Sequence, residues 1–199
     1  NKLIKRLIDI IGSIIALILF SPIMLIVAIL VKKSSPGPII FAQERIGLGN
    51  KPFKMYKFRS MYMDAEERKK ELMSQNEMEG LMFKMENDPR VTKVGKFIRK
   101  TSIDELPQFW NILKGEMSLV GTRPPTEDEF LQYEGYHRRR LNMTPGLTGL
   151  WQVSGRSDTK NFEEIVAMDV EYIDNWSLKE DIKILFKTVG VVLKGKGAS

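Results

Sequence analysis

A long run of apolar residues near the start of the chain is its clearest pattern. Residues 10–31 contain no charged side chain, and as a helix they would extend about 33 Å, close to the thickness of a bilayer core. The run is too long for the apolar region of a cleaved signal peptide, and no small-residue cleavage site follows it. We therefore predict a retained membrane segment.

This membrane segment is interrupted near its middle by Ser21 and Pro22. Proline cannot donate the backbone hydrogen bond to the carbonyl of Ile18 and clashes with it, so a bend is expected here. Basic residues flank the segment on both sides, at Lys2, Lys5, Arg6, Lys32 and Lys33. A transmembrane span normally carries them mainly on the cytoplasmic side. A re-entrant hairpin with both ends in the cytoplasm satisfies both observations, and a kinked transmembrane helix is the alternative that the sequence leaves open.

Alternation of polar and apolar residues after the membrane segment predicts a β-hairpin. An apolar run at 39–42 and an alternating stretch at 53–59 would pair across a turn at 47–52. The period of two places Lys57 and Arg59 on the same face of the second strand. These two side chains are suited either to binding phosphate or to protecting an edge strand from unwanted pairing.

Helical periodicity dominates the rest of the chain. Four helices are predicted besides a central one, at residues 64–79, 93–100, 162–176 and 178–193. The first is charged and solvated, and the second is basic and amphipathic. We therefore predict an α+β fold that is predominantly helical. It would consist of a re-entrant membrane hairpin at 1–33 and a compact cytoplasmic domain at 34–199 with amphipathic helices at the membrane interface.

Composition narrows the chemistry. The 199 residues carry a net charge of +6, which favours anionic partners such as nucleotides, polyphosphates, phospholipid surfaces or nucleic acid. Because there is no cysteine, disulfides and cysteine nucleophiles are excluded. The one histidine, His137, rules out a multi-histidine zinc cluster. It lies in the basic stretch 136–140, which we interpret as a solvated surface rather than the place of a catalytic base.

Two adjacent carboxylates, Asp104 and Glu105, are the strongest candidates for catalysis. Apolar residues at helical spacing follow them, at Leu106, Phe109, Trp110 and Leu113. A helix is therefore expected to begin between Ser102 and Asp104, where unpaired backbone N–H groups favour ionised carboxylates and attract anions. The structural alternative is a capping box formed by Ser102 and Glu105, with Asp104 as a simple N-cap.

Loops rich in glycine and proline supply further candidates. Arg123 is held between Thr122 and Pro124, which suits either a fixed guanidinium that contacts phosphate or a surface arginine in a turn. The glycine-rich loop at 144–157 matches neither the P-loop nor the dinucleotide-binding pattern.

The order of these motifs resembles that of the bacterial sugar transferases, the monotopic phosphoglycosyl transferases. The resemblance covers residues 2–194 and includes the Ser-Pro break in the membrane helix. Its motifs are Glu-Arg-Ile-Gly at 44–47, Lys-Phe-Arg-Ser-Met at 57–61, Asp-Pro-Arg at 88–90, and the stretches 101–108, 120–124 and 147–156. The family usually has proline where this chain has Thr122, which weakens the expectation of a rigid nucleotide-binding turn.

The resemblance implies transfer of a sugar 1-phosphate from a UDP-sugar, such as UDP-galactose or UDP-glucose, to undecaprenyl phosphate. Asp104 would be the nucleophile, would carry the phosphosugar covalently after UMP leaves, and would also contact Mg²⁺. Glu105 would assist the metal or the acceptor. The substrate-binding residues implied by the resemblance are Arg45, Lys57, Arg59, Arg99, Arg123, Pro124, Arg156 and Asp169.

The resemblance also implies a location and partners. The protein would lie at the cytoplasmic face of the bacterial inner membrane, in contact with phospholipid, would have no nucleic-acid partner, and could be a homo-oligomer. It would initiate the assembly of capsule, exopolysaccharide or O-antigen. Two alternatives from other classes are a membrane-tethered, non-enzymatic module that binds anionic lipid and a hydrolase that acts on lipid phosphates.

Overall fold

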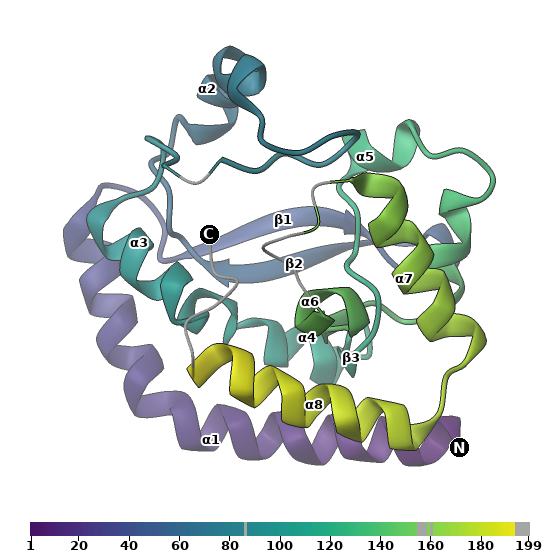
Figure 1. Cartoon of the computed structure of the whole chain (residues 1–199). Coiled ribbons are helices and arrows are strands. Elements are labelled where there is room, and N and C mark those ends of the chain that lie inside the picture. The colour runs from purple at the N-terminus through teal and green to yellow at the C-terminus, as the bar shows by residue number, and fades with distance from the viewer. Residues whose placement is uncertain (86, 155–158, 160, 194–199) are drawn as a thin grey trace.

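Helices dominate the computed structural model, which describes residues 1–85, 87–154, 159 and 161–193 (Figure 1). The fold is α+β, with a long apolar N-terminal helix and two small sheets. In chain order the elements are α1 (Lys2–Ser34), β1 (Ile40–Ile46), η1 (Leu48–Asn50), β2 (Pro52–Phe58), α2 (Ala65–Leu72), η2 (Met73–Gln75), α3 (Lys93–Lys100), η3 (Ile103–Glu105), α4 (Gln108–Lys114), β3 (Ser118–Val120), α5 (Glu127–Leu131), η4 (His137–Asn142), β4 (Gly146–Thr148), α6 (Leu150–Ser154), α7 (Phe162–Asp174) and α8 (Leu178–Leu193).

Helix α1 bends sharply at its middle, so that its first arm runs along the bottom of the molecule and its second arm rises at the left (Figure 1). We call residues 2–21 the first arm and residues 22–34 the second arm. Pro22 cannot donate to the carbonyl of Ile18, and the hydroxyl of Ser21 donates to that carbonyl instead, at 2.8 Å. The predicted bend is therefore present. By length and composition α1 is able to cross a membrane.

Three charged side chains of the first arm bind it to the rest of the chain. Lys5 Nζ lies 2.6 Å from a carboxylate oxygen of Asp181 at the start of α8. The guanidinium of Arg6 donates to two carbonyls in the last turn of α4, at 2.5 and 2.7 Å. Asp9 accepts from the hydroxyl of Ser118 at 3.0 Å. A cation at a helix C-terminus and a carboxylate that accepts hydrogen bonds are stabilising arrangements, so the first arm is an integral part of the packing.

The two small sheets differ in the relative direction of their strands. Strands β1 and β2 form the predicted antiparallel hairpin, in which Ile40 lies opposite Phe58 and Ile46 lies opposite Pro52. Strands β3 and β4 pair in parallel, and a Cβ atom on Gly146 would lie 2.0 Å from the backbone nitrogen of Gly121. The glycine in this predicted loop is therefore needed for close backbone approach, a role that the loop pattern did not reveal.

Helices α3, α7 and α8 confirm the predictions made from periodicity. The helix predicted over 64–79 is wrong in length, because α2 ends at Leu72 and continues only as the short turn η2. The reason is visible at Asn76, whose amide group bonds to the backbone of Met78, Met82 and Lys84. Such side-chain bonds compete with the helical hydrogen bonds and close a loop instead.

The basic stretch 136–140 is only partly the solvated surface that its composition predicted. His137 and Arg140 are buried, and Arg140 is 0% exposed. His137 Nδ1 accepts from the backbone N–H of Glu134, and its Nε2 lies 2.9 Å from Glu163. It packs edge-on against Phe162 and lines none of the cavities described below, so its contacts are those of a residue that stabilises the fold.

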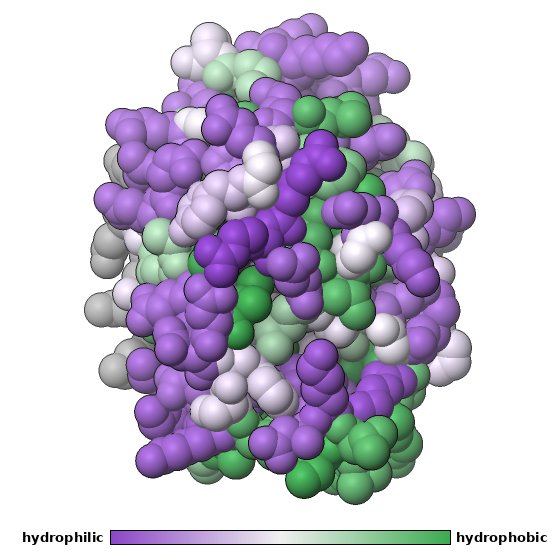
Figure 2. Space-filling model, turned by 90° about the vertical axis from the view of Figure 1, so that its right-hand side faces the viewer, coloured by the Kyte–Doolittle hydropathy of each residue, from purple (hydrophilic) through white to green (hydrophobic). Residues whose placement is uncertain are grey.

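Apolar side chains are also exposed in an unusual number. They gather at the lower edge in Figure 2, where the first arm of α1 and the start of α8 lie, below a largely hydrophilic region. The exposed apolar residues of α1 and α8 are Leu3, Ile4, Leu7, Ile8, Ile11, Ile14, Ile15, Ile18, Leu19, Ile23, Leu25, Ile26, Ile29, Leu30, Ile182, Phe186, Val189 and Val192. Exposed apolar side chains that gather in one region, as at the lower edge in Figure 2, mark a membrane or protein contact.

Candidate active site

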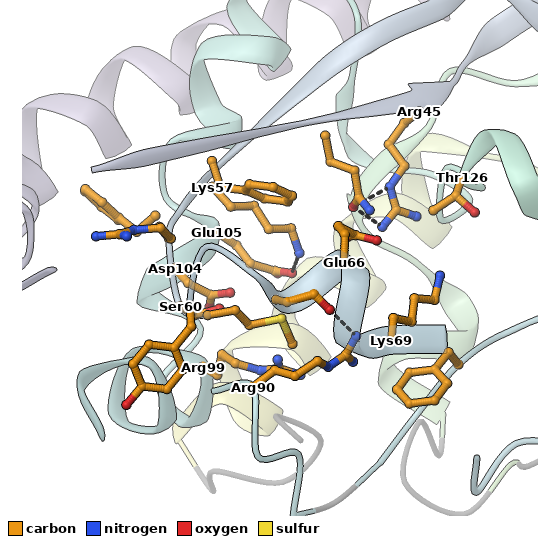
Figure 3. Close-up of a pocket in the computed structure, with 18 of the residues that line it drawn as sticks. Arg45, Lys57, Ser60, Glu66, Lys69, Arg90, Arg99, Asp104, Glu105 and Thr126 are labelled. Carbon is orange, nitrogen blue, oxygen red and sulfur yellow. Dashed lines mark hydrogen bonds and ion pairs between the residues drawn. The ribbon is translucent and has the colours of Figure 1, made fainter. Parts of the chain in front are cut away.

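A cavity of about 300 Å³ lies against the β1–β2 hairpin and is lined by charged side chains from several elements (Figure 3). Its basic residues outnumber its acidic ones. The basic side chains are Arg45, Lys57, Arg59, Lys69, Arg90, Arg99 and Arg123, and the acidic ones are Glu66, Asp104, Glu105 and Glu129. The cavity brings together residues 45 to 129 of the sequence, and its positive balance is suited to an anionic ligand.

The two adjacent carboxylates lie in the single turn η3, between α3 and α4. A helical turn does begin where it was predicted, at Ile103, but it is the short turn η3, and the α-helix starts only at Gln108. Pro107 has no N–H to donate to the carbonyl of Ile103, four residues before it, and that carbonyl accepts instead from the N–H of Leu106 at 3.2 Å, a bond over three residues. The carboxylates consequently do not depend on the dipole of a long helix.

The capping alternative also fails for this turn. Ser102 has a left-handed backbone with φ of 55°, and its side chain makes no capping hydrogen bond to the described residues. Asp104 is 7% exposed and lines the cavity. Glu105 lines it as well, and its Oε1 lies 2.8 Å from Lys57 Nζ, so that β2 and η3 are joined across the cavity wall (Figure 3).

Arg45, Arg123 and Glu129 form another part of the cavity wall. Arg123 donates to Glu129 at 3.0 and 3.3 Å, while Arg45 donates to the carbonyl of Pro124 at 2.9 Å and to Gln43. Burial, together with the charge of Arg123, lowers the pKa of Arg45 to about 9, which still leaves it charged at neutral pH. Burial alone would raise the pKa of Glu129, but the two arginines hold it below its ordinary value. One carboxylate thus faces two guanidinium groups, which leaves positive charge for a ligand to neutralise.

The remaining predicted site residues fall into three groups. Arg99 lines the cavity, whereas Arg59 lines it but directs its guanidinium to the carbonyls of Ser35 and Pro36 in the linker after α1. Burial lowers the pKa of Arg59. Asp169 is placed in the core, where it pairs with Arg140 at 2.6 Å, and it is not among the described residues that line the cavity. Arg156 lies outside the described residues.

Several cavity residues were missed in the sequence. Glu66 and Lys69 of α2 point toward the cavity, although that segment offered no predicted chemistry (Figure 3). Their separation of three residues places both on one helical face, which is the signal that could have found them. Arg90 appeared in the sequence only within the Asp-Pro-Arg motif at 88–90, without a predicted role. It pairs with Asp88 at 2.6 Å, and its guanidinium carbon lies 4.9 Å from the centroid of the Phe83 ring.

Two further cavities adjoin the first. One of about 190 Å³ shares with it Arg45, Lys57, Phe83, Arg99, Glu105 and Arg123. The other, of about 590 Å³, is mostly apolar and shares Ser102 and Glu105 with the charged cavity. Its walls come from the bend of α1 at Phe20 and Ile23, from η3 and α4, and from α8. The carboxylate turn therefore stands where a charged cavity meets an apolar groove.

Comparison with known proteins decides the family. The family described as bacterial sugar transferase matches residues 1–195, almost the entire chain. The chain belongs to the bacterial sugar transferase family.

Three relatives of this bacterial sugar transferase have informative names. The galactosyl transferase CpsE of Streptococcus agalactiae is 56% identical over 98% of the chain. The undecaprenyl-phosphate galactose phosphotransferase of Salmonella typhimurium is 47% identical over 100% of the chain, and the exopolysaccharide production protein ExoY of Rhizobium meliloti is 44% identical over 98%. The chain spans 43% and 42% of the first two relatives and 87% of ExoY.

The departure at Thr122 from the usual family motif has a local structural explanation. The Thr122 side chain is buried, and its hydroxyl donates to the carbonyl of Arg140 at 2.9 Å. This bond fixes the turn that carries Arg123 without requiring a proline at position 122.

The carboxylates of this bacterial sugar transferase are compatible with a divalent cation. Within the described part of the chain, no three histidine, cysteine or acidic side chains are grouped so as to hold a metal alone. Mg²⁺ in phosphoryl-transfer sites is usually held by one or two carboxylates together with oxygens of the substrate phosphates. Asp104 and Glu105 fit that arrangement, because both line a cavity whose basic walls are suited to a phosphorylated substrate.

Proposed function

We propose that the chain transfers a sugar 1-phosphate from a UDP-hexose of the galactose or glucose type to undecaprenyl phosphate, with release of UMP. The observation that carries this proposal is the position of Asp104, in a turn where a basic cavity meets an apolar groove. Membership of the family and the names of the relatives support galactose as the sugar and undecaprenyl phosphate as the acceptor. In this proposal the enzyme works at the cytoplasmic face of the bacterial inner membrane and initiates capsule or exopolysaccharide assembly.

In the proposed first step, a carboxylate oxygen of Asp104 attacks the β-phosphorus of the donor. The bond from that phosphorus to the bridging oxygen breaks, UMP takes the electron pair, and an acyl phosphate that carries the sugar remains on Asp104. In the second step an oxygen of the acceptor phosphate attacks the same phosphorus and restores the free carboxylate. The product is undecaprenyl diphosphate sugar, and no water is consumed.

The basic residues stabilise the negative charge that the two substrates bring together. Arg45, Arg99 and Arg123 line both the charged cavity and the smaller one beside it, so they can contact the donor phosphates. Glu105 holds the ammonium group of Lys57 at 2.8 Å. When bound by Asp104 and Glu105, Mg²⁺ would neutralise phosphate charge. Arg59, which is bonded to the linker, would act by holding the cavity wall in place.

The apolar groove provides a place for the prenyl chain of the acceptor. It begins beside Ser102 and Glu105 and continues along Phe20 and Ile23 at the bend of α1. An isoprenoid chain in this groove would place its phosphate next to Asp104. The lipid would then reach the donor without leaving the apolar surface of the molecule.

The apolar lower edge supports a re-entrant topology for α1. The bend at Ser21 and Pro22 would be the deepest point in the membrane, with both ends of the helix in the cytoplasm. Because the chain has no cysteine, single substitutions Lys2→Cys and Ser34→Cys give unambiguous labelling sites. We expect both to react with an impermeant maleimide only from the cytoplasmic face of sealed vesicles, and reaction of the two from opposite faces would establish a transmembrane helix instead.

The decisive experiment compares UMP release by the wild type and Asp104→Asn, in detergent, with Mg²⁺, undecaprenyl phosphate and a panel of UDP-sugars. We expect the substitution to reduce release by at least about a thousandfold, because an amide cannot form the acyl phosphate. Asp128→Asn, an exposed acid on α5, is the matched control. UMP release that survives in Asp104→Asn would refute the nucleophile. Inorganic phosphate as product would indicate a hydrolase, and lipid binding without turnover would indicate a non-enzymatic module.

A further inference from the structure

We infer that the smaller cavity, beside the dyad of Asp104 and Glu105, binds the hexose of the donor, and that the amide groups of Gln108 and Gln152 recognise its hydroxyl groups. This inference rests on the proposed function and assigns one part of the donor to one part of the site. It also names the residues that would determine which sugar is accepted.

The arrangement of the two polar cavities indicates the orientation in which the UDP-sugar donor binds. Their shared wall carries the basic side chains Arg45, Arg99 and Arg123, which suits the diphosphate in the middle of a UDP-sugar. Aromatic side chains line both cavities, but one has a volume of about 300 Å³ and the other of about 190 Å³. The nucleoside is the larger end of the donor and fits the larger cavity. The smaller cavity is therefore left for the hexose.

Three side chains on the wall of the smaller cavity carry an amide or indole atom that has no hydrogen-bond partner among the described residues. Gln108 is 3% exposed, lines this cavity, and its amide has no hydrogen bond to the described residues. The Oε1 atom of Gln152 and the Nε1 atom of Trp151, on the same wall, are buried and also have no partner among the described residues. Buried amide and indole groups are nearly always hydrogen-bonded, so the two buried atoms of Gln152 and Trp151 without a partner, beside the Gln108 amide on the same cavity, indicate a polar ligand.

A sugar ring matches these groups chemically. Each hydroxyl both donates and accepts, so it can satisfy an amide oxygen, an amide N–H or an indole N–H. Gln152 Nε2 donates to the carbonyl of Leu147 at 3.3 Å, so the oxygen of that amide is the atom without a hydrogen-bond partner. Gln152 is half-buried, and a side-chain rotation of the kind common on binding would present its oxygen to the ligand. Gln108 follows the dyad by one helical turn, so a hexose bound there lies next to the reacting phosphorus.

The test uses Gln108→Met and Gln152→Met, which keep the side-chain length and remove the polar atoms. Gln132→Met, on an exposed glutamine after α5, is the matched control. UMP release is measured with UDP-galactose, UDP-glucose and their singly deoxygenated analogues, and UMP is used as a competitive inhibitor. We expect kcat/KM for the preferred hexose to fall roughly tenfold in each variant, the loss of about one hydrogen bond to a neutral group. For the analogue that lacks the hydroxyl group contacted by the substituted amide, we expect the variant and the wild type to have the same kcat/KM.

Inhibition by UMP shows whether the two amides bind the hexose or the uracil ring of the donor. If the smaller cavity binds the hexose, the UMP inhibition constant stays unchanged in both variants. Weaker UMP inhibition, in step with the loss of kcat/KM, would assign the amides to the uracil ring and overturn the inference. Unchanged kcat/KM with every donor in both variants would also overturn it while leaving the proposed function intact. Failure of the wild type to release UMP from any donor would instead refute the proposed function, and this inference with it.

Discussion

Glu129 offers the sharpest test of how the cavity holds its positive charge. It is buried, accepts from Arg123 at 3.0 and 3.3 Å, and also accepts from the backbone N–H of Thr126 in the capping box of α5. The substitution Glu129→Gln keeps the shape of the side chain, and glutamine, like glutamate, can complete a capping box. It removes only the negative charge that faces Arg45 and Arg123.

The expected loss of stability follows from these contacts. Hydrogen bonds to charged groups contribute about 1.5–3 kcal/mol, and the Arg123 side chain is 23% exposed, so we take the lower end, about 1.5 kcal/mol. That corresponds to roughly a tenfold lower ratio of folded to unfolded protein. Without its partner Arg123 is also no longer fixed, and we expect kcat/KM for the UDP-sugar to fall by a similar factor.

The effect should depend on pH in a defined direction. The arginines lower the pKa of Glu129 in the folded protein below its ordinary value of 4.5. A carboxylate with a lowered pKa stabilises the folded state fully above that ordinary value, and the stabilisation is lost as the pH falls through the folded pKa. The difference between wild type and Glu129→Gln should therefore be constant near neutral pH and should shrink below about pH 4.5.

Thermal unfolding in detergent at several pH values measures this difference, with UMP release measured on the same preparations. Glu127→Gln is the matched control, because Glu127 is exposed in the same first turn of α5. An unfolding midpoint of Glu129→Gln equal to that of the wild type at pH 7 would refute the assigned charge pairing. So would a difference that persists unchanged at pH 3.

Three further results are expected. Arg140→Met leaves the carboxylate of Asp169 buried without its partner and should cost about 3–5 kcal/mol of stability in thermal unfolding, while the double variant with Asp169→Leu should recover most of it. Gly95→Ala would place a Cβ atom 1.9 Å from the carbonyl oxygen of Ser60, so the backbone must shift, and a loss of about 1–3 kcal/mol with reduced UMP release is expected. Chelation of divalent cations should abolish UMP release, and added Mg²⁺ should restore it; release that persists without divalent cations would contradict the proposed metal.

Features with a short-range cause were predictable from the sequence. The β1–β2 hairpin follows from alternation over a few residues, and the bend of α1 follows from one proline and the carbonyl it leaves free. Helices α7 and α8 follow from apolar spacing. The two adjacent carboxylates Asp104 and Glu105 were candidates because of their position before a helical pattern, and the structure places both in the charged cavity.

Features that depend on distant partners were not predictable in the same way. Arg140 stands in a run of basic residues and looks solvated, but Asp169, 29 residues later, makes burial possible. Asp169 was named for substrate binding by the resemblance, and its pairing with Arg140 was not visible, because the two residues are far apart in the sequence. Glu66 and Lys69 share one face of α2, but no local pattern shows that this face lines the cavity.

The charged residues of α1 bear on where the proposed chemistry takes place. Lys5, Arg6 and Asp9 would be poorly placed in a helix that served only as a tether, because charged groups in an apolar helix are costly without partners. Here each has a protein partner on α8, α4 or β3. The first arm is thus fixed to the helix that follows the dyad, and the apolar edge has one orientation relative to Asp104. In the proposed topology, the depth of the catalytic carboxylate at the membrane is therefore set by packing within the fold, not by the length of a flexible linker.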